Sequence, residues 1–598
     1  MKSCDCTQRN YKKAFVALAH IVSLVLLCAT AGQPSSGRPP RQSSTRHEQA
    51  APPTNAYVGS QECALCHNDI YEKYSHTDMG RSMRQPDAAL AKTIPTSISI
   101  FDQRLNRHFE QYLKDGALFQ SEFELAADGK DVFRETHQVN WIIGAGANGL
   151  GGIVQRGDYL FEAPLSFYSN INAWALSPGY QYADYGFSRP ILPGCVSCHS
   201  GRPQPVLDGN GKFRKPPFQE LAVGCENCHG PGEAHIAAAS RDTIVNPARL
   251  SGWLADNVCL PCHQTGDARV LHAGKDYSDF RPGSTLDDTL SIFMVPFKAQ
   301  APPQDDLLEH YLSMRLSKCY SQSAGKLSCI SCHQPHTQPT AAEAPDYFRQ
   351  RCLTCHTEQS CSVPFAERQK QKPADNCILC HMPKRDVKVI SHSVLTNHRI
   401  VRTPQEPFPD AAFKMTTEHL PDLVHLSAEP GKNGAVPPLT LLQAYRQVML
   451  SHPEYRQRYW KLAKDLKRTE PNNITVLQAL ADVSLQTKNQ EGLKAAITYL
   501  DRARLQGTTQ PADFEQLAKM LIATRQDTRA VEVLQQGIGL VPYDAELYRL
   551  LGRTYFSLKK SSDACALLDK ANQTFPHDAT MRDLLKQCAL TQNDSLAH

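Results

Sequence analysis

The sequence predicts a mainly α-helical protein with extensive loops, in which a cysteine-rich domain with a small β-rich insert precedes an α-helical repeat array. Three observations indicate this organisation. The pattern Cys-x-x-Cys-His recurs seven times in the first two thirds of the chain. The 598 residues include 40 prolines and only 41% hydrophobic residues, which is typical of a loop-rich protein of two or three domains. Towards the C-terminus, long helical periodicity recurs in blocks of 34 residues.

The seven Cys-x-x-Cys-His motifs determine the expected chemistry. Two thiols at this spacing can form thioether bonds to the two vinyl groups of one haem, and the adjacent histidine supplies an axial ligand to its iron. The motif cysteines are Cys63, Cys66, Cys195, Cys198, Cys225, Cys228, Cys259, Cys262, Cys329, Cys332, Cys352, Cys355, Cys377 and Cys380. The motif histidines are His67, His199, His229, His263, His333, His356 and His381. Together these residues predict seven covalently attached c-type haems with their iron, and hence a multihaem cytochrome c domain.

Other uses of these cysteines fit less well. Zinc ribbons have no reason to place a histidine after every second cysteine, and a disulfide framework would not repeat one spacing seven times. A thioredoxin-like role requires a βαβ context, which surrounds none of the motifs. The charge is nearly balanced, with 64 Lys and Arg against 60 Asp and Glu, so nothing suggests a nucleic-acid partner. Covalent porphyrins would also supply apolar bulk that a loop-rich sequence lacks, as metals do for small domains.

The N-terminal residues 1–31 are typical of an export signal. Two lysines precede an apolar run over residues 14–27, and Ala-Thr-Ala follows as a cleavage site. The alternatives are an uncleaved membrane anchor, for which the run falls short of about 20 apolar residues, and a lipoprotein signal at Cys28, which the preceding leucine disfavours. We expect a periplasmic or otherwise exported protein that meets a membrane only if the signal stays uncleaved. Residues 32–56 predict a disordered tether.

A long interval without motifs interrupts the expected haem-bearing domain, residues 57–400. Alternation of apolar and polar residues around an Asp-Gly turn predicts a hairpin there, so we expect a β-rich insert from about 95 to 170. Within it, Gly144-Ala-Gly146-Ala-Asn-Gly149 matches G-x-G-x-x-G. The residues that follow predict a strand and a turn, whereas a dinucleotide site requires a helix. We interpret this segment as a glycine-rich connection between strands.

The C-terminal part of the chain changes in character after residues 401–438, which hold seven prolines and predict a linker. Residues 439–590 predict tetratricopeptide repeats. The repeat positions are occupied by Tyr548, Leu551, Gly552, Tyr555, Ala564, Ala571 and Pro576, and one block earlier by Phe514, Leu517, Ala518, Leu521, Ala530, Gly537 and Pro542. Because about three repeats are needed to bury a continuous core, we expect a small solenoid; an unrelated helical bundle is the alternative.

Four stretches of the chain resemble a known family. They are Cys63-Ala-Leu-Cys66-His67 with His76, Gly224-Cys225 through Gly-Pro-Gly-Glu-Ala-His235, Cys319 leading to Cys329 through His336, and Cys380-His381-Met-Pro with Thr396-Asn-His398-Arg-Ile. In these motifs and their order, residues 57–400 resemble the multihaem cytochromes of the cytochrome c554 and doubled-CXXCH family, in the form with a C-terminal tetratricopeptide array. The resemblance implies haem binding and electron transfer outside the cytoplasm. It also implies roles as haem ligands for His76, His310 and His398.

Distal haem ligands determine which function is expected, because an iron with two protein ligands transfers electrons and one with an open face can transform a small molecule. Seven candidates match the seven motifs: His76, His137, His235, His310, His336, His392 and His398. We expect His336 to serve a neighbouring haem, since it follows His333 too closely to share its iron. We interpret His108 and His272 as surface residues.

Three functions follow from these observations. The main prediction is an electron carrier between redox partner proteins. One alternative is an oxidoreductase with one open-site haem that acts on a small nitrogen or sulfur oxyanion. No Cys-x-x-Cys-Lys motif occurs, and a tyrosine cross-linked to haem stays open. The other is a docking subunit of a respiratory complex, in which the repeat array binds a protein partner and the haems lie beside a redox enzyme.

Four cysteines remain outside the motifs and the signal segment. We expect a disulfide between Cys319 and Cys361, because both flank the densest group of motifs and the compartment is expected to be oxidising. A sulfur ligand from Cys319 to an iron is the alternative. The other two, Cys565 and Cys588, lie on repeat helices and are expected to be buried.

Overall fold

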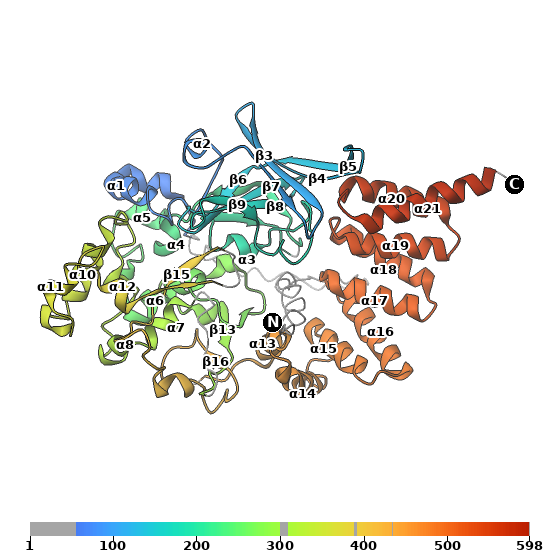
Figure 1. Ribbon diagram of the computed structural model, residues 1–598. Coiled ribbons are helices and arrows are strands. Elements are labelled where there is room, and N and C mark those ends of the chain that lie inside the picture. The colour runs from blue at the N-terminus through green and yellow to red at the C-terminus, as the bar shows by residue number, and fades with distance from the viewer. Residues whose placement is uncertain (1–54, 208, 300–308, 388–391, 433, 597–598) are drawn as a thin grey trace, which may run out of the picture.

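The computed structural model describes residues 55–596, except 208, 300–308, 388–391 and 433 (Figure 1). The expected signal segment and nearly all of the expected tether lie outside the described residues. Within the part of the chain that is described, no helix is both long and apolar enough to cross a membrane.

The β-rich insert is a sandwich of two antiparallel sheets. One sheet has the order β1-β6-β7-β8-β9 and the other β2-β3-β4-β5. The strands are β1 (Met83–Arg84), β2 (Ile98–Asp102), β3 (Arg107–Lys114), β4 (Ala117–Leu125), β5 (Asp131–Gln138), β6 (Trp141–Ile143), β7 (Gly149–Arg156), β8 (Tyr159–Tyr168) and β9 (Ala173–Leu176). Alternate residues of β3 are buried, as the pleat of a half-covered strand requires. Phe109 and Leu118 of one sheet pack against Leu150 and Leu165 of the other.

The glycine-rich segment connects β6 to β7, as interpreted from the sequence. Gly144 and Gly146 have φ values of +99° and +94°, which residues with a side chain rarely adopt. A Cβ on Gly144 would lie 2.6 Å from the carbonyl oxygen of Gly149. The glycines therefore serve a tight turn between strands, and no helix follows them.

The part of the chain that carries the motifs consists of short helices joined by loops. Together with the sandwich it is called the body. The motifs lie on or at the end of α1 (Ser60–Ser75), α3 (Pro193–Val196), α4 (Cys225–His229), α6 (Gly252–His263), α9 (Cys329–Cys332), α10 (Ala344–Leu353) and α12 (Cys377–His381). The other helices are α2 (Leu90–Thr93), α5 (Glu233–Ala238), α7 (His310–Arg315), α8 (Lys318–Gln322) and α11 (Phe365–Arg368). The remaining strands are β10 (Arg202–Pro205), β11 (Phe213–Glu220), β12 (Ala268–Leu271), β13 (Leu290–Met294), β14 (Lys384–Asp386), β15 (Val394–Thr396) and β16 (Val424–His425). With five sheets among the described residues, the fold is mixed α and β, and the prediction of a mainly α-helical protein is corrected in this respect.

The proline-rich residues 401–438 do more than connect two domains. Their strand β16 pairs with β13 of the body. Leu420 and Leu423 are buried in one hydrophobic core, and Leu426 in another. Apolar residues among the prolines therefore anchor this segment, which the proline count alone does not reveal.

The C-terminal helices form antiparallel pairs in a curved array (Figure 1). They are α13 (Pro438–Ser451), α14 (Arg456–Leu466), α15 (Ile474–Leu485), α16 (Gln490–Leu505), α17 (Pro511–Ala523), α18 (Asp527–Leu540), α19 (Ala545–Ser557), α20 (Ser561–Thr574) and α21 (Ala579–Leu596). Small residues at the repeat positions allow the helices to approach closely. A Cβ on Gly552 would lie 2.9 Å from Leu568, and Ala530 and Ala564 are fully buried. The array is a tetratricopeptide-type solenoid, as the sequence predicts.

The array is joined to the body at both ends. At one end, Leu442 and Val448 of α13 share a hydrophobic core with Ala268, Val270 and Phe293 of strands β12 and β13. At the other end, charged side chains connect α20, α21 and the residues between them to the sandwich. This contact is made by Arg107 with the carbonyl of His577, by Arg156 with the carbonyl of Thr574, and by Glu124 with Arg582.

Candidate functional site

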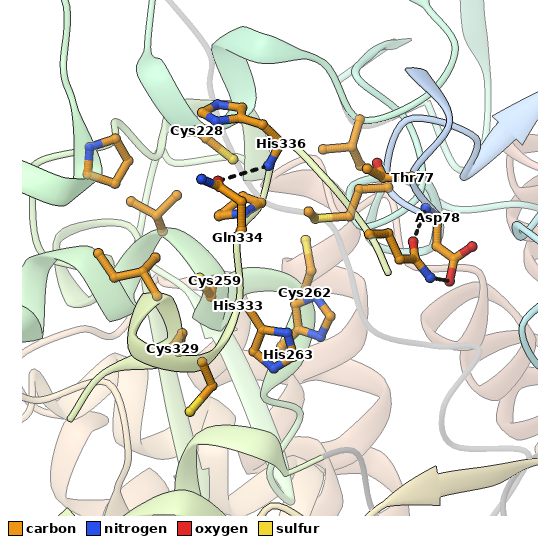
Figure 2. Close-up of a pocket in the computed structure, with 18 of the residues that line it drawn as sticks. Thr77, Asp78, Cys228, Cys259, Cys262, His263, Cys329, His333, Gln334 and His336 are labelled. Atoms are coloured by element: carbon orange, nitrogen blue, oxygen red, sulfur yellow. Dashed lines mark hydrogen bonds between the residues drawn. The ribbon is translucent and has the colours of Figure 1, made fainter. Parts of the chain in front are cut away.

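A cavity of about 2430 Å³ runs through the motif-bearing body. Pockets for single small molecules measure roughly 300–1,000 Å³, so this cavity is several times larger. Every one of the seven motifs contributes at least one lining residue. Figure 2 shows Cys228 of the third motif, Cys259 and Cys262 of the fourth and His333 of the fifth around the same space. The fold thus brings the motifs together around one space.

Large apolar side chains are exposed at the wall of this cavity. Leu65, inside the first motif, is 78% exposed, Ile236 is 52% exposed and Ile70 is 44% exposed. Such side chains usually avoid water, and exposed apolar patches commonly mark binding surfaces. The wall therefore suits a large apolar group.

The motifs meet in an order that differs from their order in the chain. The Cys225 thiol raises the pKa of Cys63, and the Cys259 thiol raises that of Cys329. Likewise the neighbouring Cys262 lowers the pKa of Cys198 to about 6. The first motif therefore lies beside the third, the second beside the fourth, and the fourth beside the fifth. The sixth and seventh motifs are neighbours through Cys352 and Cys377.

Motif histidines face histidines from other segments. The rings of His67 and His235 are stacked with centroids 6.3 Å apart and 11° between their planes. The rings of His229 and His336 are 5.9 Å apart and 5° from parallel. His333 pairs similarly with His398, at 6.1 Å and 25°. His263 meets His310 edge to face, with centroids 5.3 Å apart.

Five of the histidines have one ring nitrogen held by a backbone carbonyl. Nδ1 of His229 lies 2.7 Å from the oxygen of Val245, and Nδ1 of His381 lies 2.7 Å from that of Val401. The same contact is made by Nδ1 of His76, His235 and His398. A carbonyl at this position selects the tautomer with hydrogen on Nδ1 and leaves Nε2 as the ligating nitrogen.

Burial keeps several of the motif histidines and candidate distal ligands neutral. It lowers the pKa of His310 to about 2, helped by the neighbouring His398 and His263, and it lowers that of His398 to about 4. The pKa values of His199 and His333 are also lowered by burial. A metal binds the neutral imidazole, so these rings are in the ligating form at neutral pH.

The seven expected distal ligands divide into two groups. His235, His310, His336 and His398 line the cavity, and the ring of His336 faces that of His229. The other three are not among the lining residues.

The three outlying histidines have other surroundings. His76 is exposed at the end of α1. His137 lies on β5, where Nε2 is 2.9 Å from Glu135 and the ring packs on Phe187. His392 packs on Tyr168 of the sandwich. The structure does not bring these residues to the cysteines.

The cysteines outside the motifs are paired differently from the expectation. Cys319 and Cys361 are both free thiols, so the proposed disulfide between them is corrected. The structure instead joins Cys565 to Cys588, which links α20 to α21. In the sequence, this pairing is indicated by the position of the two cysteines on neighbouring repeat helices. Asn148 and Asn170 also line the cavity, so the sandwich contributes to its wall at two positions for which the sequence gives no functional signal.

The residues present fit covalent haem. A porphyrin iron needs only two protein ligands, and imidazole nitrogens bind metals at about 2 Å. Two facing imidazoles with an iron between their Nε2 atoms would therefore have centroids about 6 Å apart. The stacked pairs at His67, His229 and His333 have this separation. The cysteine spacing, the carbonyl-held Nδ1 atoms and the exposed apolar wall agree with the same group.

Comparisons with known proteins give solved structures that cover about a quarter of the chain. No family model matches the chain, and no curated protein matches it. Among solved structures, the MamA protein from Desulfovibrio magneticus RS-1 is 19% identical, with 27% of this chain and 88% of that chain covered and a TM-score of 0.23. A thermophilic tetratricopeptide protein of Thermus thermophilus, TTC0263, is 18% identical, with 25% and 81% covered and a TM-score of 0.21. YrrB, described as a tetratricopeptide protein with an unusual peptide-binding site, is 15% identical, with 26% and 78% covered and a TM-score of 0.24.

The main functional prediction is corrected on these findings. Two of these solved structures, TTC0263 and YrrB, are described as tetratricopeptide proteins. The described residues also contain no group of three or more His, Cys, Asp or Glu side chains that could hold a metal ion. On the absence of such a metal-binding group from the described residues, the prediction of an electron-carrying multihaem cytochrome is corrected in favour of the docking alternative.

Proposed function

We propose that this chain is a docking subunit that binds a protein partner on its tetratricopeptide array. The observation that carries the proposal is the exposure of large apolar side chains on the array. Both of its ends are fixed to the body, while Leu505 at the end of α16 is 69% exposed and Leu450 at the end of α13 is 42% exposed. Repeat arrays present extended surfaces that bind peptides or helices.

Helix α14 carries exposed positively charged side chains. Its exposed side chains include Arg456 and Lys464, and the adjoining Lys467 and Arg468 are also exposed. Lys467, directly after α14, lies 5.6 Å from the ring of Tyr499 on α16, so these two helices contribute to one face of the array. We infer that the partner presents acidic side chains around an apolar centre, because such a surface complements this face.

Covalent haem is a second part of the proposal. The motif cysteines would attach it, and the motif histidines with His235, His310, His336 and His398 would ligate its iron. Bound haem supplies one-electron redox chemistry. We infer that the partner is a redox enzyme, beside which this subunit holds the haems, and that the complex lies outside the cytoplasm, where c-type haem is attached.

Co-purification tests the docking function. The full-length chain and two variants are isolated from its native cells. The double variant combines Lys464→Glu with Leu505→Asp. The control variant is Lys560→Glu, which changes an exposed residue beyond the proposed face. We expect one stoichiometric partner with the parent and the control chain, and its loss with the double variant. Equal recovery of the partner with all three chains, or the absence of any stoichiometric partner, refutes the proposal.

A further inference from the structure

Glu226, between the two cysteines of the third motif, is a buried carboxylate that holds two segments together. The residue is only 2% exposed. Its Oε2 accepts a hydrogen bond from the backbone N–H of Gly59 at 2.7 Å. Its Oε1 accepts from Val58 at 3.0 Å and from Gly232 at 2.8 Å. Charge-assisted hydrogen bonds of this kind are about twice as strong as neutral ones.

These two segments lead to the two histidines of one stacked pair. Val58 and Gly59 lie immediately before α1, which carries His67. Gly232 is the N-cap of α5, which carries His235. The carboxylate therefore lies at the point where both histidine-bearing helices begin.

Further contacts fix the same two segments in register. The side-chain amide of Asn55 donates to the carbonyl of Pro231 and accepts from the N–H of Ala234. The backbone N–H of Ala56 donates to the Glu233 carboxylate at 2.8 Å. These contacts lie at exposed positions, whereas the Glu226 contacts are shielded from water. Glu226 therefore provides the strongest of these connections.

Space around the carboxylate is limited. A Cβ on Gly232 would lie 3.0 Å from Val58 and 3.2 Å from Oε1 of Glu226. Since three N–H groups point at this carboxylate, a glutamine amide would turn an NH₂ group towards at least one of them. Substitution by glutamine thus keeps the volume but replaces one of the two acceptor oxygens with a donor, and the two segments have to separate.

We propose that Glu226 is a positioning residue that sets the separation of the His67 and His235 rings, and thereby the two-histidine ligation of iron at the first motif. The inference rests on the proposed covalent haem. It assigns to a residue inside the third motif a role at the first motif, which lies beside it in space but far from it in the chain. The reason is the geometry given above: one side chain spans the starts of both ligand-bearing helices.

The test uses the full-length, haem-loaded protein and its Glu226→Gln variant. Haem content is measured first, then the low-temperature electron paramagnetic resonance spectrum of the oxidised protein. We expect unchanged haem content in the variant, because every cysteine is retained. One site's share of the low-spin signal should shift or become high-spin, because the rings of His67 and His235 no longer face each other at the parent distance.

The matched control is Asn227→Ala, at the next position of the same motif. Asn227 accepts from the N–H of Gly224 and donates to the carbonyl of Gly201, so its loss disturbs the third motif without touching the segments before α1 and α5. We expect the parent spectrum. If Glu226→Gln gives too little protein, Gly232→Ala applies a smaller displacement to the same contact.

The outcomes separate the two proposals. A parent protein without haem overturns the cofactor proposal and this inference with it. A haem-loaded Glu226→Gln or Gly232→Ala variant with the parent spectrum overturns the inference alone, and so does an equal change in Asn227→Ala.

Discussion

The side-chain amide of Gln447 pairs with the peptide of Arg269. Its Nε2 donates to the Arg269 carbonyl at 2.9 Å, and its Oε1 accepts from the Arg269 N–H at 2.8 Å. Gln447 belongs to α13, the first helix of the repeat array, and Arg269 to β12 of the body. The amide thus satisfies the N–H and the carbonyl of one residue at the edge of β12. The array and the body share one hydrophobic core beside this contact.

This contact makes the first repeat helix part of the body. We expect Gln447→Ala to lower the free energy of unfolding by about 1–3 kcal/mol, since it leaves two partly buried peptide groups without partners. The control is Gln443→Ala, whose Nε2 bonds within the array to Thr475 at 3.3 Å. Urea unfolding followed by circular dichroism compares the two. A loss with Gln443→Ala equal to that with Gln447→Ala contradicts the role of the strand edge.

The contact at the other end of the array depends on a buried carboxylate, Glu135 of β5. Burial alone would raise its pKa, but the hydrogen bond with His137, the neighbouring His577 at 3.7 Å and the charge of Arg156 lower it to about 2. A carboxyl whose pKa is lowered on folding stabilises the protein above its ordinary pKa of about 4.5. This contribution is lost as the pH falls towards 2.

We therefore expect Glu135→Gln to destabilise the protein at neutral pH by roughly 3 kcal/mol. The free energy of unfolding of the variant should also fall less steeply than that of the parent chain between pH 4.5 and 2. Glu122→Gln is the opposite control. Burial and the neighbouring Asp184 raise the pKa of Glu122, so its neutral substitute should not lower stability at neutral pH. Parallel pH profiles for the parent and Glu135→Gln contradict the assignment.

Substitutions of two glycines on the repeat helices distinguish the cost of overpacking from the gain in helix propensity. Gly552→Ala places a Cβ within 2.9 Å of the fully buried Leu568. Overpacking costs typically about 1–3 kcal/mol, and the gain in helix propensity is about 1 kcal/mol, so we expect a net loss of about 1 kcal/mol. Gly539→Ala, with no neighbour within 4 Å of its Cβ, should instead gain about 0.5–1 kcal/mol. Thermal unfolding measures the stability of both variants. If both substitutions stabilise the protein, a methyl group fits beside Leu568 and the expected overpacking at Gly552 is wrong.

The sequence predicts local features of this chain better than it predicts their meeting points. Periodicity and small residues are local signals, and they locate the repeat array and the strands of the insert. The curvature that brings His577 against the sandwich leaves no local signal, because it arises from many small rotations between successive repeats.

Candidate ligands show the same limit. His235, six residues after a motif histidine, has a glycine-rich turn before it and lines the cavity. By residue type alone, His137 is an equally good candidate ligand, but in the structure its ring contacts Glu135 on the same strand. Spacing does not say which haem His235 would serve, whereas in the structure its ring lies opposite that of His67. Long-range hydrogen bonds decide these pairings, and no periodicity encodes them.

The pairing of His336 with His229 gives a test that distinguishes spatial from sequential assignment. His336 follows His333 by three residues, yet its ring stacks on His229 of the third motif at 5.9 Å. In the haem-loaded protein we therefore expect His336→Ala to create one high-spin site, because one iron loses a ligand. Removing the third motif as well, by Cys225→Ala, Cys228→Ala and His229→Ala, should abolish that high-spin signal along with the haem that gives it. Removing the fifth motif instead, by Cys329→Ala, Cys332→Ala and His333→Ala, should leave the signal in place. The opposite result would assign His336 to its sequence neighbour.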